Sequence, residues 1–210
     1  MSTKLFKSIK ATFAATLFLI IVTLLSGCNS GSSVVSNLPR VNANGNLVGT
    51  NVFDETLSIQ TGKMDGKPGW PRYVPANFTI PANTIIKLTI INYDDGTAPL
   101  PSNSPWSKFW GSDPTFGLVE GGDETVNGKK ITSVDPNNVS HTFTVPSLLI
   151  NLPIPAAVSK NQPAVVTFEF SVSKPGNYHW LCAAPCGSGS TGMGGAMNTS
   201  NWMEGTMEVK

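Results

Sequence analysis

The stretch VTFEFSVSKPGNYHWLC, residues 166–182, decides the fold of this chain. In its first part, large apolar residues occupy one parity and Thr, Glu and Ser occupy the other, which is the period of a half-buried β-strand. The apolar residues are Val166, Phe168, Phe170 and Val172. Lys174–Asn177, with its Pro-Gly pair, is expected to form a turn, and Tyr178–Cys182 is expected to form the next strand.

Short strands of this kind recur along the chain. They include Thr56–Gln60, Phe78–Ile80, Ile85–Asn92 and a final strand that carries Met207 and Val209 on one face. Pro81–Asn83 reads as a turn between two of them, and no segment shows a long helical period. Regular short strands separated by Gly/Pro turns predict an all-β, Greek-key β-sandwich, which we place in one domain at residues 47–210.

A segment at about residues 99–138 interrupts the strand pattern. It holds Trp106, Phe109, Trp110 and Phe116 among Ser, Gly and Pro. A loop of this length is uncommon unless it has a function or packing of its own. We interpret it as a long irregular insertion that caps one end of the sandwich, and a surface for docking a partner is the alternative.

The N-terminus has the pattern of a bacterial lipoprotein signal. Three lysines precede an apolar region at residues 11–25, which ends in Leu-Ser-Gly before Cys28. We therefore expect a signal peptide at residues 1–27, lipid on Cys28, and a flexible Ser/Asn/Gly-rich tether at residues 28–46. An ordinary anchor helix or a simple secretory signal is the alternative. The lipoprotein interpretation places the protein in the cell envelope, outside the cytoplasm and anchored to a membrane.

Charge and composition exclude some classes of function. Cleavage before Cys28 removes three lysines and no acidic residue, so the formal charge changes from +1 to −2. No basic stripe indicates nucleic-acid binding. Two histidines and no Ser/His/Asp arrangement at strand-end turns argue against a hydrolase.

Soft metal-binding side chains lie at the ends of the expected strands. His141 shares its parity with Phe143 and Val145, Cys182 ends the penultimate strand, and Met203 stands just before the last strand; Cys186 follows Cys182 in the connecting loop. One imidazole, two thiolates and a thioether are the donors that copper sites use. The pattern predicts a copper site. A Cys182–Cys186 disulfide is the alternative in an oxidising compartment.

Three motifs resemble those of the cupredoxins, and most of all the dinuclear copper A domain of cytochrome c oxidase subunit II. They are HTFTVPSL at residues 141–148, YHW at residues 178–180 and CAAPCG at residues 182–187. The resemblance covers residues 78–210, with residues 99–138 inserted. It implies one or two copper ions, electron transfer with a respiratory redox partner, and a redox carrier more than an enzyme.

The chain also departs from that family. The position of the family's second histidine, four residues after its second cysteine, is Ser190, and the family's methionine spacing falls on Met193. Met203 fits the final-strand context better and is the first choice of thioether, followed by Met193 and then Met197. His179 lies on the opposite strand face from Cys182, so we expect a surface histidine there. A lipid anchor stands where subunit II has two transmembrane helices, which indicates a stand-alone relative.

The missing imidazole keeps two other functions open. Thiolates and thioethers without a second imidazole hold Cu(I) well, so the chain could store copper or deliver it to a copper-acceptor protein. A disulfide between the two cysteines would instead leave a cupredoxin with a structural role.

Overall fold

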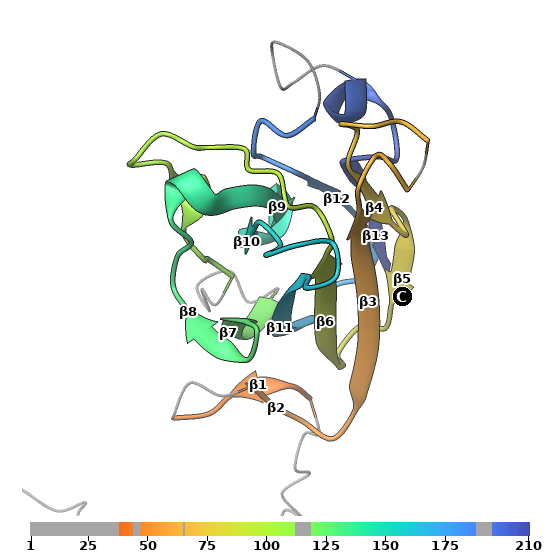
Figure 1. Cartoon of the computed structure of the whole chain (residues 1–210). Coiled ribbons are helices and arrows are strands. Elements are labelled where there is room, and N and C mark those ends of the chain that lie inside the picture. Colours follow the sequence, from red (N-terminus) through yellow and green to blue (C-terminus); the bar gives the residue numbers. More distant parts are fainter. Residues whose placement is uncertain (1–37, 44–46, 65, 112–118, 188–194) are drawn as a thin grey trace, which may run out of the picture. The chain divides into compact units, whose positions relative to one another are not determined.

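The computed structural model describes residues 38–43, 47–64, 66–111, 119–187 and 195–210, which are built mainly from β-strands (Figure 1). The expected signal peptide, Cys28 and most of the expected tether lie outside these ranges. At the end of the tether range, β1 (Arg40–Val41) pairs with β2 (Leu47–Val48). Within the described ranges, no helix is long and apolar enough to cross a membrane.

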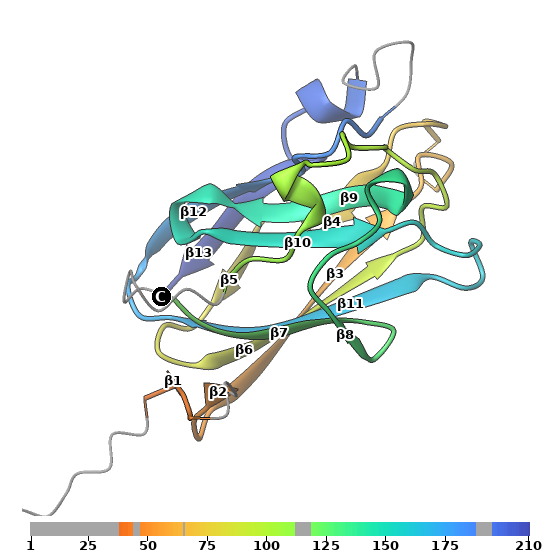
Figure 2. The same ribbon diagram turned by 90° about the vertical axis from the view of Figure 1, so that its left-hand side faces the viewer.

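Two larger sheets form the described domain, and Figure 2 shows them stacked face to face. The first has the strand order β10-β9-β12-β13-β5: β5 (Phe78–Ile80), β9 (Val139–Val145), β10 (Ile150–Pro155), β12 (Gly176–Leu181) and β13 (Glu204–Val209). The second has the order β4-β3-β6-β11-β7-β8: β3 (Val52–Gln60), β4 (Arg72–Val74), β6 (Ile85–Asn92), β7 (Val119–Val126), β8 (Lys129–Ile131) and β11 (Ala164–Val172). The predicted all-β sandwich is confirmed.

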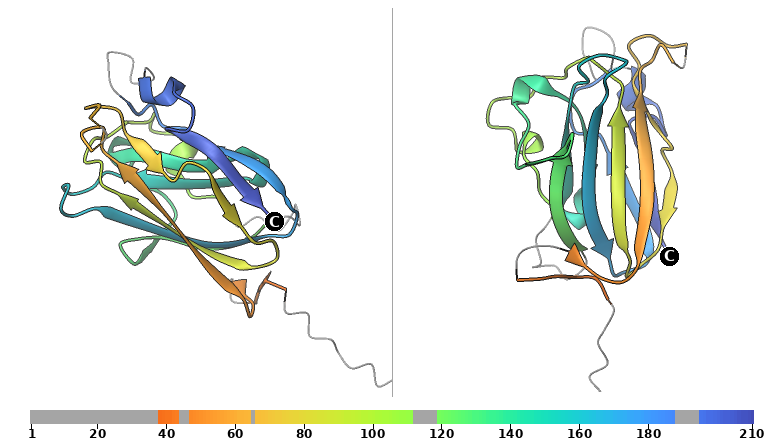
Figure 3. Two further views of the ribbon diagram at one scale, coloured as in Figure 1. Left: turned by 90° about the vertical axis from the view of Figure 1, so that its right-hand side faces the viewer. Right: turned by 60° about the horizontal axis from the view of Figure 1, so that its bottom comes forward.

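Most neighbouring strands in these sheets are antiparallel. The parallel pairs are β13 with β5 and β3 with β6. Short 3₁₀ helices lie between strands: η1 (Pro105–Ser107), η3 (Pro136–Asn138), η4 (Pro146–Leu148) and η5 (Gly195–Asn198). Figure 3 shows β3, β6, β11 and β7 side by side in the larger sheet.

The core lies between the two sheets. On β6, the inward residues Ile86, Leu88 and Ile90 are fully buried, which is the period of a strand with one face on a core. On the opposite sheet, every residue of β9 is buried. An aromatic cluster fills the core close to β9, with the Phe143 and Trp180 ring centroids 5.3 Å apart. This packing makes β9 and β12 a rigid base for the residues at their ends.

The expected strands are present, with changes at their ends. β6 matches the predicted Ile85–Asn92, whereas the predicted Thr56–Gln60 is the second half of β3. β12 begins at Gly176, so the preceding turn is shorter than Lys174–Asn177, and Cys182 follows the strand instead of ending it. On β13, Met207 and Val209 are buried on one face as predicted.

The segment 99–138 is less irregular than expected. Its second half contains β7 and β8, which pair as a hairpin and extend the larger sheet beyond β11. Its first half packs on the domain, with the Phe109 and Phe168 ring centroids 5.5 Å apart and Trp110 bridged to Asn151. Phe116 lies outside the described residues. The described parts of the segment therefore have packing of their own.

Candidate metal centre

The centre is built where β9 and β12 meet the loop that follows β12. Leu181, the last residue of β12, pairs with Thr144 of β9, which brings the start of the cysteine loop beside His141. In that loop the Cys182 N–H donates to the Met203 carbonyl at 2.8 Å. The loop is thereby tied to the segment that leads into β13, and its two cysteines turn into the domain.

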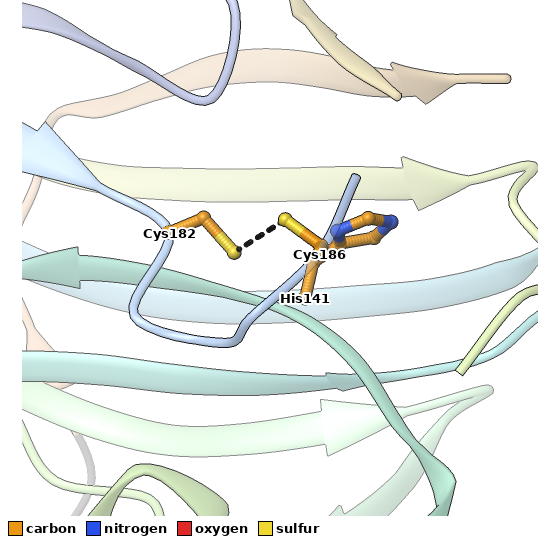
Figure 4. A group of neighbouring side chains, drawn as sticks. All are labelled: His141, Cys182 and Cys186. Atoms are coloured by element: carbon orange, nitrogen blue, oxygen red, sulfur yellow. Dashed lines mark hydrogen bonds between the residues drawn. The ribbon is translucent and has the colours of Figure 1, made fainter. Parts of the chain in front are cut away.

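His141, Cys182 and Cys186 form one buried group. One donor atom from each residue lies within 4.8 Å of the others, and the side chains are exposed by 4% or less. Both cysteines are free thiols, and their Sγ atoms point toward each other at 3.3 Å beside the imidazole (Figure 4). The Thr142 N–H donates to Cys182 Sγ at 3.4 Å, which holds that sulfur in place. The structure thus brings together three residues that the sequence predicted as metal ligands.

The imidazole of His141 has one engaged and one unengaged nitrogen. Its Nε2 lies 3.1 Å from Asp94 Oδ2. Its Nδ1 is buried and has no hydrogen-bond partner among the described residues. A buried nitrogen without a partner is costly unless something binds it. Together with two nearby sulfurs, this nitrogen fits a metal ion that accepts imidazole and thiolate donors.

The methionines are arranged differently from the expected ranking. Met197, the third choice, places its Sδ atom 3.1 Å from Cys186 Sγ. Met203, the first choice, is buried and contributes its backbone carbonyl to Cys182. Met193 and Ser190 lie outside the described residues. The thioether of Met197 is therefore in contact with Cys186.

The charges of the group are coupled. Burial raises the pKa of the Cys182 thiol, but the Cys186 hydrogen bond and the adjacent His141 lower it more, to well below its usual value. The hydrogen bond to Cys182, together with burial, raises the pKa of Cys186. Burial lowers the pKa of His141, but the hydrogen bond to Asp94 and the nearby Cys182 sulfur raise it more, to about 9. One thiolate, one thiol and an imidazolium thus share protons that a metal ion would displace.

Two other polar side chains complete the surroundings and were not predicted. Asp94 follows β6 in the turn Asn-Tyr-Asp-Asp-Gly, and a polar turn after a buried strand is a weak signal that many surface loops share. Tyr73 of β4 is fully buried and donates its hydroxyl to the Thr142 carbonyl at 2.9 Å. His179 is exposed and pairs with Glu204 at 3.2 Å, which confirms that it is a surface histidine.

A cavity of about 680 Å³ opens beside the group. Its lining includes His141 and Cys186 together with Asp94, Met64 and Lys160. The loops that surround it lie at the end of the sandwich where β3, β6 and β12 finish (Figure 1). The buried donors are therefore reached from this end of the domain.

Comparisons with known proteins give structural neighbours only. No protein-family model matches the chain, and no curated protein matches it. A rusticyanin described as a copper protein aligns with 83% of this chain and 88% of its own, at 14% identity and a TM-score of 0.38. Rusticyanin from Thiobacillus ferrooxidans aligns over 83% and 87%, at 14% identity and a TM-score of 0.35. Auracyanin B aligns over 83% and 99%, at 12% identity and a TM-score of 0.34.

Proposed function

We propose that this protein binds copper through His141, Cys182, Cys186 and a methionine thioether, and that it carries electrons in the cell envelope. The observation that carries the proposal is the buried group itself, with three donor atoms within 4.8 Å of one another. The contact between Met197 Sδ and Cys186 Sγ adds a fourth soft donor. Imidazole, thiolate and thioether together favour copper, and methionine is a poor ligand for zinc.

The surroundings suit an electron carrier because they are rigid and almost fully buried. Bound copper supplies a one-electron couple. His141 lies on a fully buried strand, and Cys182 is fixed by the Thr142 and Met203 backbones, so the donors move little when the charge changes. The two sulfurs are almost fully buried, which limits the access of water and oxidants to them.

Two finer features extend the proposal. Paired sulfurs 3.3 Å apart suit either one copper ion or two ions bridged by thiolates, and the resemblance to the copper A domain favours two. Lipid on Cys28 would tether the domain to a membrane, next to a respiratory redox partner. A lone acyl chain binds membranes only weakly, so the anchor needs more than one.

Metal analysis with electron paramagnetic resonance tests this function. We expect bound copper in wild type and loss of it in Cys182→Ser and in Cys186→Ser, with His179→Ala as the matched control because His179 is exposed and outside the group. A hyperfine pattern of a mixed-valence pair indicates two ions, and the pattern of an isolated Cu(II) indicates one. A wild-type protein that holds a Cys182–Cys186 disulfide and takes up no copper overturns the proposal.

Copper delivery is the second candidate, and the cavity favours it. The cavity is lined by both Cys186 and His141, so an acceptor protein has a route to the donors. The donor set described here has three sulfurs and one imidazole, which suits Cu(I). Rapid transfer of Cu(I) to an apoprotein acceptor supports delivery. Copper that stays bound in the presence of the acceptor and shows a reversible redox couple supports the electron-carrier function.

A further inference from the structure

We infer that Asp94 is the residue that positions the metal-binding imidazole, by accepting a hydrogen bond from Nε2–H of His141 so that Nδ1 is left to bind the ion. The inference rests on the proposed metal centre and adds a residue that no motif in the sequence assigns. The two residues are 47 positions apart in the chain, and their contact joins Asp94 Oδ2 to His141 Nε2 at 3.1 Å.

Asp94 is held firmly enough to do this. Its other carboxylate oxygen, Oδ1, accepts from the Gly96 N–H at 3.1 Å, which leaves Oδ2 for the histidine. Its backbone N–H donates to Asn92 Oδ1 at 2.9 Å, and its carbonyl accepts from the Ala157 N–H at 2.9 Å. Asn92 is itself buried and donates to the Pro155 carbonyl at 2.9 Å. The backbone of Asp94 is therefore anchored to the end of β6 and to the segment that follows β10, and its carboxylate is held by Gly96.

This anchored acceptor decides which ring nitrogen carries a hydrogen. A carboxylate accepts hydrogen bonds, so Nε2 must be protonated to bind Asp94. When the ring gives up its other proton to bind an ion, the lone pair lies on Nδ1, which is the buried nitrogen without a partner. Outer carboxylates of this kind fix the orientation of a metal-binding histidine and increase its basicity, and their loss typically weakens metal affinity by about 10- to 100-fold.

The test compares Asp94→Ala and Asp94→Asn in the full-length protein. Asn retains an oxygen acceptor in nearly the same place without the charge, whereas Ala removes the acceptor. Asp95→Asn is the matched control, because Asp95 is the exposed neighbour that lines the same cavity. Thermal unfolding of each variant checks that the domain remains folded.

The first measurement needs no copper. The chain has two histidines, so their ring signals can be assigned by nitrogen-15 NMR, with the exposed His179 as internal reference. In the metal-free protein we expect a slowly exchanging Nε2–H for His141 in wild type, Asp94→Asn and Asp95→Asn. In Asp94→Ala this hydrogen should exchange rapidly. Retention of the slow hydrogen in folded Asp94→Ala overturns the inference.

The second measurement is Cu(I) affinity, by competition with a chromogenic chelator. We expect Asp94→Ala to bind about 10- to 100-fold more weakly than wild type, Asp94→Asn to recover most of the loss, and Asp95→Asn to match wild type. In the Cu(I)-loaded protein, the chemical shift of Nδ1 should change and Nε2 should keep its hydrogen. Coordination through Nε2, or equal affinity in wild type and Asp94→Ala, overturns the inference. If wild type takes up no copper, the proposed function is overturned instead. The metal-free NMR measurement still tests the contact between Asp94 and His141 in that case, because it needs no copper.

Discussion

At the scale of single residues, the sequence and the structure favour different methionines as the thioether ligand. Met203 has the expected place before the last strand, yet Met197 lies against Cys186. Met203 is buried in the core cluster beside the cysteines, and its carbonyl accepts from Cys182. A leucine can replace a buried methionine at a cost below about 1.5 kcal/mol, so the two roles can be separated by substitution.

We expect Met197→Leu to weaken Cu(I) binding and Met203→Leu to leave it nearly unchanged. Leucine keeps the volume and apolar character of each side chain but removes the sulfur that donates to the metal. Competition with a Cu(I) chelator measures the difference, and Met207→Leu is the control because Met207 is a fully buried core residue on β13. A larger loss in Met203→Leu than in Met197→Leu would restore the ranking that the sequence favoured.

His141 and Cys182, two residues of the centre that the sequence identified, lie on or next to regular strands. The side-chain period of two fixes which face His141 occupies, and Cys182 follows β12 directly, so strand pattern and chain order were sufficient. Asp94 lies in a loop and Met197 in the short helix η5, where no strand period relates one residue to the next. Their contacts with His141 and Cys186 depend on how loops from different strands meet. Such contacts are set by the whole fold, so the sequence did not name Asp94 and ranked Met197 only third.

At the scale of elements, the segment that precedes β7 is attached to β10 by one side chain. Asn151 is fully buried, and its Nδ2 donates to the carbonyls of Trp106 and Lys108 at 3.2 and 2.7 Å. Its Oδ1 accepts from the Thr144 hydroxyl at 2.7 Å. The Asn151 side chain therefore forms hydrogen bonds with a hydroxyl of β9 and with two carbonyls of the segment that precedes β7. Any substitution leaves these buried polar groups without partners.

We predict that Asn151→Ala lowers the free energy of unfolding by about 3 kcal/mol, since each buried group left unpaired costs about 1–3 kcal/mol. Urea denaturation measures the change. Asn137→Ala is the matched control, because Asn137 is exposed in η3. A change below about 1 kcal/mol would mean that the segment is held by its aromatic packing and not by Asn151.

The strands that the sequence predicted share a clear apolar alternation, as in β6 and β11. The hairpin of β7 and β8 was missed because the sequence of β7, VEGGDETV, contains charges and glycines that are unfavourable in strands. It is a strand because β11 offers it a complete antiparallel edge. Pairing with β11 thus outweighed the low strand preference of the β7 sequence. Such pairing cannot be predicted from the residues of one segment alone.

At the scale of the whole molecule, that hairpin also introduces a buried acid. Glu124 lies opposite Phe168 of β11 and Ile131 of β8, and it has no exposed surface. Neither of its carboxylate oxygens has a hydrogen-bond partner among the described residues. Burial raises the pKa of Glu124 from 4.5 to about 9, so the folded domain holds this carboxyl in its neutral form at pH 7.

A raised pKa makes the stability of the whole domain depend on pH. Below pH 4.5 the carboxyl is protonated in both the folded and unfolded chains, and its contribution is constant. As the pH rises from 4.5 toward 9, the unfolded chain loses the proton while the folded chain keeps it, so folding becomes less favourable by about 1.4 kcal/mol per pH unit.

We therefore expect Glu124→Gln to remove this loss. Between pH 5 and 8, the free energy of unfolding of wild type should fall relative to Glu124→Gln by about 4 kcal/mol in total, as measured by urea denaturation at each pH. The other ionisable groups are common to both proteins, so their effects cancel in the difference. Glu169→Gln, on the exposed face of β11, is the matched control and should keep the wild-type slope. Parallel curves for wild type and Glu124→Gln would mean that the Glu124 carboxyl ionises equally in the folded and unfolded chains, and that water or a cation reaches it within the fold.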